Sequence, residues 1–99
     1  MNVSSLFESV KLGRLNLKNR IVLPPLTRSR STQPGNIPND LMATYYAQRA
    51  TAGFMVTEGV QIEPRGQGYA WTPGIFTAEQ IEGWKKVTQR VHDKGGKIF

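Results

Sequence analysis

The chain has 99 residues, 38% of them hydrophobic, so its length allows one small domain. Lys and Arg number 13 against 7 Asp and Glu, but the basic residues are scattered, which argues against a nucleic-acid-binding surface. No apolar stretch approaches the roughly 18 residues of a membrane helix, and the N-terminus lacks the pattern of a signal peptide. Cysteine is absent, which excludes disulfides and cysteine metal sites and is compatible with the cytoplasm, where we expect this protein.

The first predicted elements are a hairpin and a short strand. Alternating apolar residues flank Gly13-Arg14, and this pattern predicts a small capping hairpin within residues 6–17. Branched apolar residues over 20–23 predict a strand that ends at Pro24-Pro25, because two successive prolines remove two donors from the ladder. Freed from ladder pairing, the chain after this strand can turn its backbone toward a ligand.

A helix and a second strand are predicted next. Apolar spacing indicates a helix that begins near Pro38 and stops at Gly53. Residues 54–57 then form a predicted strand that ends at Glu58-Gly59. The residues expected along one face of the helix are Leu41, Tyr45 and Ala52, with Met42 and Tyr46 beside them.

The last third of the chain predicts a long loop, a second helix and the start of a third strand. The loop covers about residues 61–76, and Thr77 and Gln80 form a capping box at the start of the helix. Gly95-Gly96 ends this helix, and residues 97–99 begin the strand. The residues at helical spacing are Ile81, Trp84, Val87 and Val91.

The order of these elements is typical of parallel βαβ units in an α/β protein. A parallel sheet is covered by helices on both faces or closes into a barrel. The predicted strands and helices are too few for either arrangement, and a (β/α)₈ barrel needs roughly 250 residues. We therefore expect residues 1–99 to be an incomplete part of one larger domain, and the resemblance described next implies its N-terminal part.

Five segments of the sequence stand out together, residues 6–13, 17–28, 45–50, 57–59 and 68–75. Taken in this order and spacing, they resemble the old yellow enzyme family of flavin-dependent reductases. The match extends from about Leu6 to Phe99. The sequence is similar to the bacterial branch of the family, which reduces enones, nitroesters and related electrophiles. Each segment is a weak signal alone, but together they are specific.

The resemblance implies a TIM barrel of which this chain supplies about two and a half βα units plus the capping hairpin. It also implies one domain that binds FMN non-covalently at the carboxyl ends of its strands. NADPH or NADH would supply hydride, and the substrates would be activated alkenes such as α,β-unsaturated carbonyls, with nitro compounds or nitroesters as a further class. The matched flavin contacts are Pro25, Leu26, Thr27 and Gly59, and the matched substrate-side residues are Tyr69 and Trp71.

Physical arguments support these matches, and each has a plainer alternative. The Thr27 hydroxyl can donate to the flavin O4 region, a bond that strengthens as the ring gains negative charge, but it can also cap the following loop. Gly59 lacks a Cβ and lets backbone approach a flat ring, or it is an ordinary turn glycine. Tyr69 and Trp71 can sandwich a planar substrate against the flavin, or they serve to pack their loop on the barrel. For Glu58 we expect a structural hydrogen bond or ion pair.

Several other residues are interpreted without a catalytic role. His92 is the single histidine, so we expect a surface residue and no metal site. Arg28 and Arg30 are interpreted as solvated loop charges, and residues 66–68 lack the third glycine of a dinucleotide fingerprint. By resemblance, the proton donor, the substrate-gripping pair and the phosphate site lie beyond Phe99. This chain alone is therefore expected to be inactive; the alternative function is a non-catalytic subunit that complements another chain.

Overall fold

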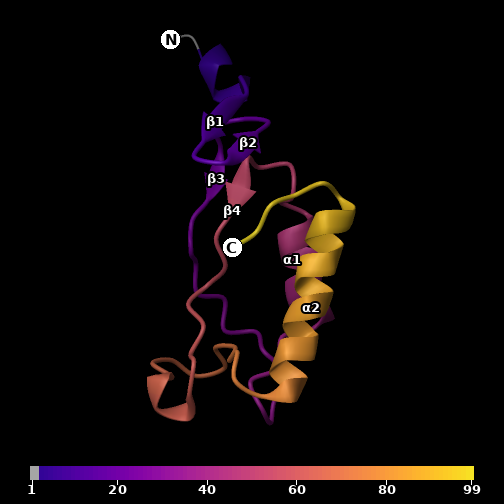
Figure 1. Ribbon diagram of the computed structural model, residues 1–99. Helices are drawn as coiled ribbons and strands as arrows, with labels where there is room; N and C mark the ends of the chain where they lie inside the picture. The colour runs from indigo at the N-terminus through magenta and orange to yellow at the C-terminus, as the bar shows by residue number, and fades with distance from the viewer. Residues whose placement is uncertain (1–2) are drawn as a thin grey trace.

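The computed structural model describes residues 3–99 as an elongated α/β unit of 47 × 26 × 24 Å. The hairpin lies at one end and η2 at the other, with α1 and α2 on one side of the strands (Figure 1). Within the described part of the chain, no helix is long and apolar enough to cross a membrane. The elements are η1 (Ser4–Phe7), β1 (Val10–Leu12), β2 (Leu15–Leu17), β3 (Val22–Leu23), α1 (Asp40–Ala47), β4 (Phe54–Met55), η2 (Pro64–Gly66) and α2 (Ala78–Asp93).

The hairpin and the parallel strands are confirmed. β1 and β2 pair in antiparallel register, with Val10 opposite Leu17. β3 and β4 pair in parallel, and regular pairing of β3 stops before Pro24 as predicted. Met55 also forms a parallel bridge with Ile98, so the predicted third strand lies on the far side of β4. This arrangement brings the carboxyl ends of the strands to the same edge.

The first helix differs from the prediction in its ends and in its buried face. Asn39 is the N-cap, because its side chain accepts a hydrogen bond from the Met42 N–H at 3.0 Å, and α1 ends at Ala47 rather than at Gly53. Leu41, which we expected on the buried face, is 62% exposed. Packing against α2 decides which face is buried, and the residues that meet the core are Met42, Ala43, Tyr46 and Ala50.

Gly53 is not a helix stop. Its N–H donates to the Ile21 carbonyl at 2.7 Å, so it belongs to the start of the β4 ladder. A Cβ at this position would lie 2.4 Å from the Asn19 carbonyl oxygen. The glycine is therefore explained by a close backbone approach and not by a left-handed helix terminus.

Both predicted ends of α2 are confirmed. The capping box of Thr77 and Gln80 is formed, and Gly95 has a φ of +76°. The Gly95 and Gly96 N–H groups donate to the His92 and Val91 carbonyls, a Schellman ending. The predicted apolar face needs one correction, because Ile81 is 43% exposed. Here α2 meets α1 through other residues, and the buried set is Gln80, Gly83, Trp84, Val87 and Val91.

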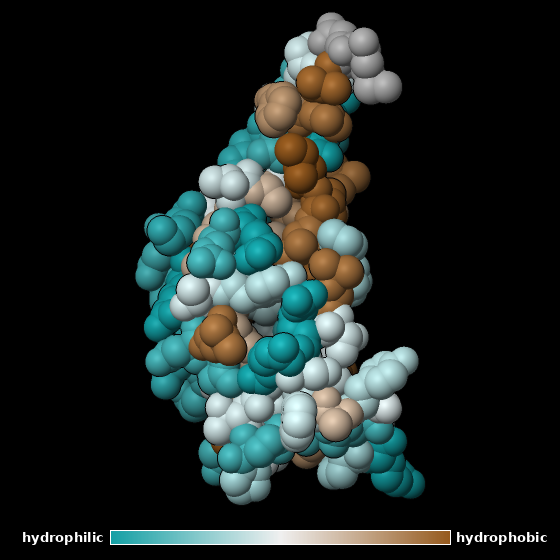
Figure 2. Space-filling view, turned by 180° about the vertical axis from the view of Figure 1, so that it is seen from behind, coloured by the Kyte–Doolittle hydropathy of each residue, from teal (hydrophilic) through white to brown (hydrophobic). Residues whose placement is uncertain are grey.

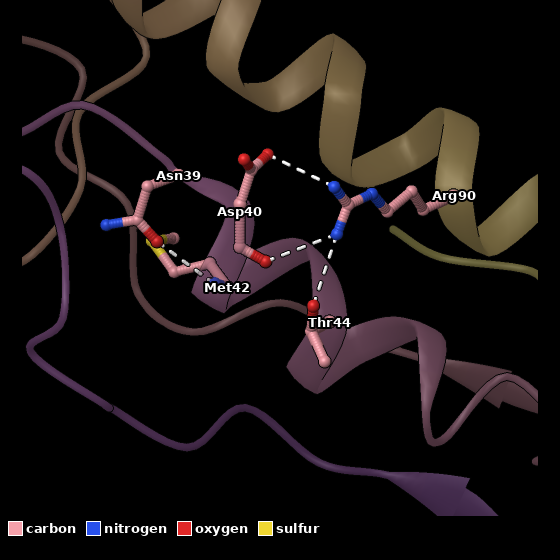
Figure 3. Close-up of polar contacts among 5 residues, drawn as sticks. All are labelled: Asn39, Asp40, Met42, Thr44 and Arg90. Carbon is pink, nitrogen blue, oxygen red and sulfur yellow. Dashed lines mark hydrogen bonds and ion pairs between the residues drawn. The ribbon is translucent and has the colours of Figure 1, made fainter.

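Arg90 joins the two helices on their exposed side. Its guanidinium donates to Asp40 Oδ1 at 3.2 Å and to Thr44 Oγ1 at 3.1 Å (Figure 3). A longer contact of 3.4 Å reaches the Asp40 carbonyl. These bonds connect the last turns of α2 to the first turns of α1, next to the Asn39 cap.

The strand side of the molecule carries a band of exposed apolar side chains. Figure 2 shows this band extending from the N-terminal end along the side away from the polar face of the helices. A large exposed apolar patch usually marks a surface that contacts another part of a protein or a ligand. The large apolar residues exposed in the N-terminal quarter are Val3, Leu6, Phe7, Leu12, Ile21 and Val22.

Candidate flavin site

Three of the predicted site residues come together at the carboxyl ends of β3 and β4. Thr27 and Gly59 each lie four residues beyond their strand, and both line a hollow together with Tyr69. Because the two strands are parallel, residues from separate loops meet at this edge. We call this surface the Thr27 hollow; its lining is Thr27, Gly59, Val60, Gln61, Gly66, Gly68, Tyr69 and Thr72.

The loop that carries Tyr69 is held by a pair of buried side chains that the sequence did not single out. Gln61 Nε2 donates to the Thr72 carbonyl at 2.8 Å, and Thr72 Oγ1 lies 3.0 Å from Gln61 Oε1. The same hydroxyl is 3.0 Å from the Tyr69 carbonyl. Gln61 and Thr72 are each under 7% exposed, so the two sides of the hollow are fixed to one another. Polar residues inside a glycine-rich loop gave no sequence signal for this pairing.

The other predicted residues do not line the Thr27 hollow. Pro25 and Leu26 lie beside Thr27 on the exposed surface, and Leu26 is 43% exposed. The Trp71 ring is also exposed, while its backbone adopts a φ of +64°. The Trp71 carbonyl accepts bonds from the Ser31 N–H at 3.2 Å and from the Ser31 hydroxyl at 2.7 Å. Trp71 therefore connects its loop to the segment after β3.

The Thr27 hollow has the properties that a flat, hydrogen-bonding ligand requires. The Thr27 hydroxyl makes no hydrogen bond to any residue in 3–99, so the loop-capping alternative is wrong for this side chain. A Cβ added to Gly59 would meet nothing within 4 Å, so the chain itself does not need glycine there. Tyr69 lines the Thr27 hollow and is 71% exposed, so it is accessible to a ligand. A free donor, open space and an exposed ring fit an FMN isoalloxazine ring.

Glu58 forms the expected structural hydrogen bond, and its side chain is buried next to Gly59 in the sequence. Tyr46 Oη donates to Glu58 Oε2 at 2.7 Å, and the Glu58 N–H donates to Tyr46 Oη at 2.9 Å. Glu58 Oε1 has no partner among residues 3–99. Burial raises the pKa of Glu58, against the opposing effects of the Tyr46 hydroxyl and of Arg28. Burial and the nearby carboxyl likewise raise the pKa of Tyr46.

The raised pKa of Glu58 predicts that the stability of the fold depends on pH. The folded state holds the Glu58 proton more tightly than the unfolded state, whose pKa is near the ordinary 4.5. The stabilising contribution is therefore complete below that pH and is lost as the pH rises through the folded pKa. As the pH rises through the folded pKa of Glu58, we expect the urea midpoint of the wild type to fall relative to that of Glu58→Gln. Glu79→Gln removes an exposed carboxyl and is the matched control; a parallel profile for wild type and Glu58→Gln would contradict a buried, proton-holding Glu58.

The remaining charged residues lie outside the Thr27 hollow. Arg28 and Arg49 both stack on the Tyr45 ring, with guanidinium carbons 5.3 Å and 4.1 Å from its centroid. His92 is exposed in the last turn of α2. Residues 3–99 contain no group of three acidic, histidine or cysteine side chains that could hold a metal ion. The chemistry of this surface is therefore that of hydroxyl, backbone and aromatic groups.

Comparison with known families identifies the family of this chain. The model of the NADH:flavin oxidoreductase / NADH oxidase family matches residues 5–99, and the chain belongs to this family. Within it, the resemblance to old yellow enzymes is confirmed by a solved structure, the old yellow enzyme homologue from Zymomonas mobilis. That structure superimposes with a TM-score of 0.90 at 46% identity and covers 96% of this chain. Morphinone reductase in complex with tetrahydroNAD gives a TM-score of 0.89 at 48% identity and covers 95%.

Curated relatives give the same family. The chain is 50% identical over 90 residues to 12-oxophytodienoate reductase 1 of Oryza sativa subsp. japonica, and 48% identical over 98 residues to the flavin oxidoreductase hxnT of Emericella nidulans. These matches cover 90% and 95% of this chain but only 23% and 25% of the relatives. The chain thus spans about a quarter of the length of the proteins it matches.

Proposed function

We propose that this chain forms one wall of the active site of an FMN-dependent NAD(P)H ene-reductase whose domain is a (β/α)₈ barrel. The observation that carries the proposal is the convergence of Thr27, Gly59 and Tyr69 on one hollow at the carboxyl ends of parallel strands. In barrels of this kind, active sites lie at that edge. The apolar band on the strand side is the surface that we assign to the rest of the barrel.

Each residue has a proposed part in holding the cofactor and substrate. The Thr27 hydroxyl donates a hydrogen bond to the flavin, and Gly59 leaves room for its ring, with Pro25 and Leu26 beside them. Tyr69 and Trp71 cover the substrate side. Bound FMN supplies the hydride carrier between a nicotinamide and the β-carbon of an activated alkene. Two relatives are named for 12-oxophytodienoate and morphinone, which supports a carbonyl-activated alkene as the substrate class here.

Thr27→Ala in the full-length flavoprotein is expected to make the flavin harder to reduce. A hydrogen bond to a group that gains charge contributes about 1.5–3 kcal/mol. For a two-electron couple this corresponds to a decrease of about 30–65 mV in reduction potential. Redox titration measures the shift, and Thr27→Ser, which keeps the hydroxyl, is the matched control. An unchanged or raised potential in Thr27→Ala would remove Thr27 from the flavin site.

A further inference from the structure

A buried pair, Tyr46 and Glu58, holds the main chain immediately before Gly59. One phenol oxygen accepts the Glu58 N–H at 2.9 Å and donates to the Glu58 carboxyl at 2.7 Å. The two residues are 1% and 2% exposed, so water does not replace either bond. The backbone and the side chain of residue 58 are therefore fixed by a single atom from α1.

The position of that atom depends on a rigid framework and not on the loop it holds. Tyr46 lies in the core between α1 and α2. Its ring meets Tyr45 edge to face at a centroid distance of 5.0 Å. The Asn39 cap and the Arg90 contacts hold the first turns of the same helix (Figure 3). The Tyr46 hydroxyl therefore holds Glu58 at a fixed position relative to α1.

Glu58 also faces the segment that follows Thr27. Arg28, the residue after Thr27, lines a pocket together with Glu58. The Glu58 carboxyl therefore lies between the two loops that supply Thr27 and Gly59 to the hollow.

We propose that Tyr46 and Glu58 are positioning residues of the flavin site, with the Tyr46 hydroxyl fixing the peptide between Thr57 and Glu58 and thereby the backbone that leads to Gly59. Neither side chain lines the Thr27 hollow, so the pair acts through Gly59 and the Thr27 loop. This inference rests on the proposed function, because it assigns the pair a part in FMN binding.

The test is FMN affinity in the full-length protein carrying Tyr46→Phe. This variant keeps the ring in the core and removes both hydrogen bonds, and we expect FMN to bind about tenfold more weakly. Tyr45→Phe is the matched control, since its hydroxyl has no hydrogen-bond partner in residues 3–99, and its FMN affinity should equal that of the wild type. The melting temperature of each apoprotein separates a loss of affinity from a general loss of stability.

A second variant keeps the inference testable if Tyr46→Phe does not fold. Glu58→Ala leaves the phenol in place and removes its side-chain partner, and it should weaken FMN binding in the same direction. Wild-type affinity in the folded variants would overturn the inference while leaving the proposed function intact. A wild-type protein that binds no FMN would instead contradict the proposed function itself.

Discussion

Gly83→Ala is expected to lower the stability of the full-length protein by about 2 kcal/mol. A Cβ at Gly83 would lie 2.4 Å from the Pro38 carbonyl oxygen and 3.0 Å from Pro38 Cδ. Alanine favours a helix over glycine by up to about 1 kcal/mol, but overpacking costs about 1–3 kcal/mol or more. The steric cost is at the upper end of this range, because the contacted oxygen belongs to backbone just before α1 and cannot rotate away.

Urea denaturation measures this effect, with Gly68→Ala as the control. At Gly68 an added Cβ would meet nothing within 4 Å, so the control should be as stable as the wild type or more so. A Gly83→Ala protein with wild-type stability would contradict the close approach of α2 to the start of α1. Tyr46 packs in one buried cluster with Trp84 and Val87 of α2, so the result also bears on the flavin site.

Gly59→Leu is expected to weaken FMN binding by roughly 100-fold. The leucine side chain would project from a backbone that lines the Thr27 hollow, where a Cβ would meet no other residue of 3–99 within 4 Å apart from its chain neighbours. The fold tolerates the change, but the space proposed for the flavin ring is taken. An overpacking cost of about 3 kcal/mol corresponds to this loss of affinity.

Gly59→Ala is the matched variant for this prediction. One methyl group projects much less far than a leucine, so FMN affinity should remain within a few-fold of the wild type. Equilibrium dialysis or flavin fluorescence quenching measures both variants, and circular dichroism checks that both are folded. Wild-type affinity in Gly59→Leu would place the flavin away from Gly59.

Local chemistry made several elements predictable from sequence. Gly13-Arg14 marked the hairpin turn, the Thr77–Gln80 capping box marked the start of α2, and Gly95-Gly96 marked its end. Pro24-Pro25 marked the end of β3. Each of these signals depends on neighbouring residues alone, so no knowledge of the fold was needed.

Features decided by distant contacts were not predictable. The buried face of α1 is selected by α2, which is why Leu41 is exposed where apolar spacing placed it in the core. Glycine is required at position 53 because the carbonyl oxygen of Asn19, in the connection between β2 and β3, approaches it closely. The Tyr46–Glu58 pair joins a helix to a loop, and periodicity gives no sign of such a bond.

The candidate site shows the same division. The resemblance gave Thr27, Gly59 and Tyr69, and the fold brings them to one hollow. Gln61 and Thr72, which hold that hollow together, required the folded loop to be found. Trp71 lies outside this lining; its ring is exposed and its carbonyl accepts hydrogen bonds from Ser31.

The most direct test of the central claim is an anaerobic titration of the full-length protein. We expect FMN to co-purify with it in equimolar amount, to lose its oxidised absorbance on addition of NADPH or NADH, and to recover it on addition of 2-cyclohexenone. A parallel titration with a nitroester tests the further substrate class. A protein that purifies without FMN, or a reduced flavin that the enone does not reoxidise, would contradict the proposal that the Thr27 hollow is one wall of an ene-reductase site.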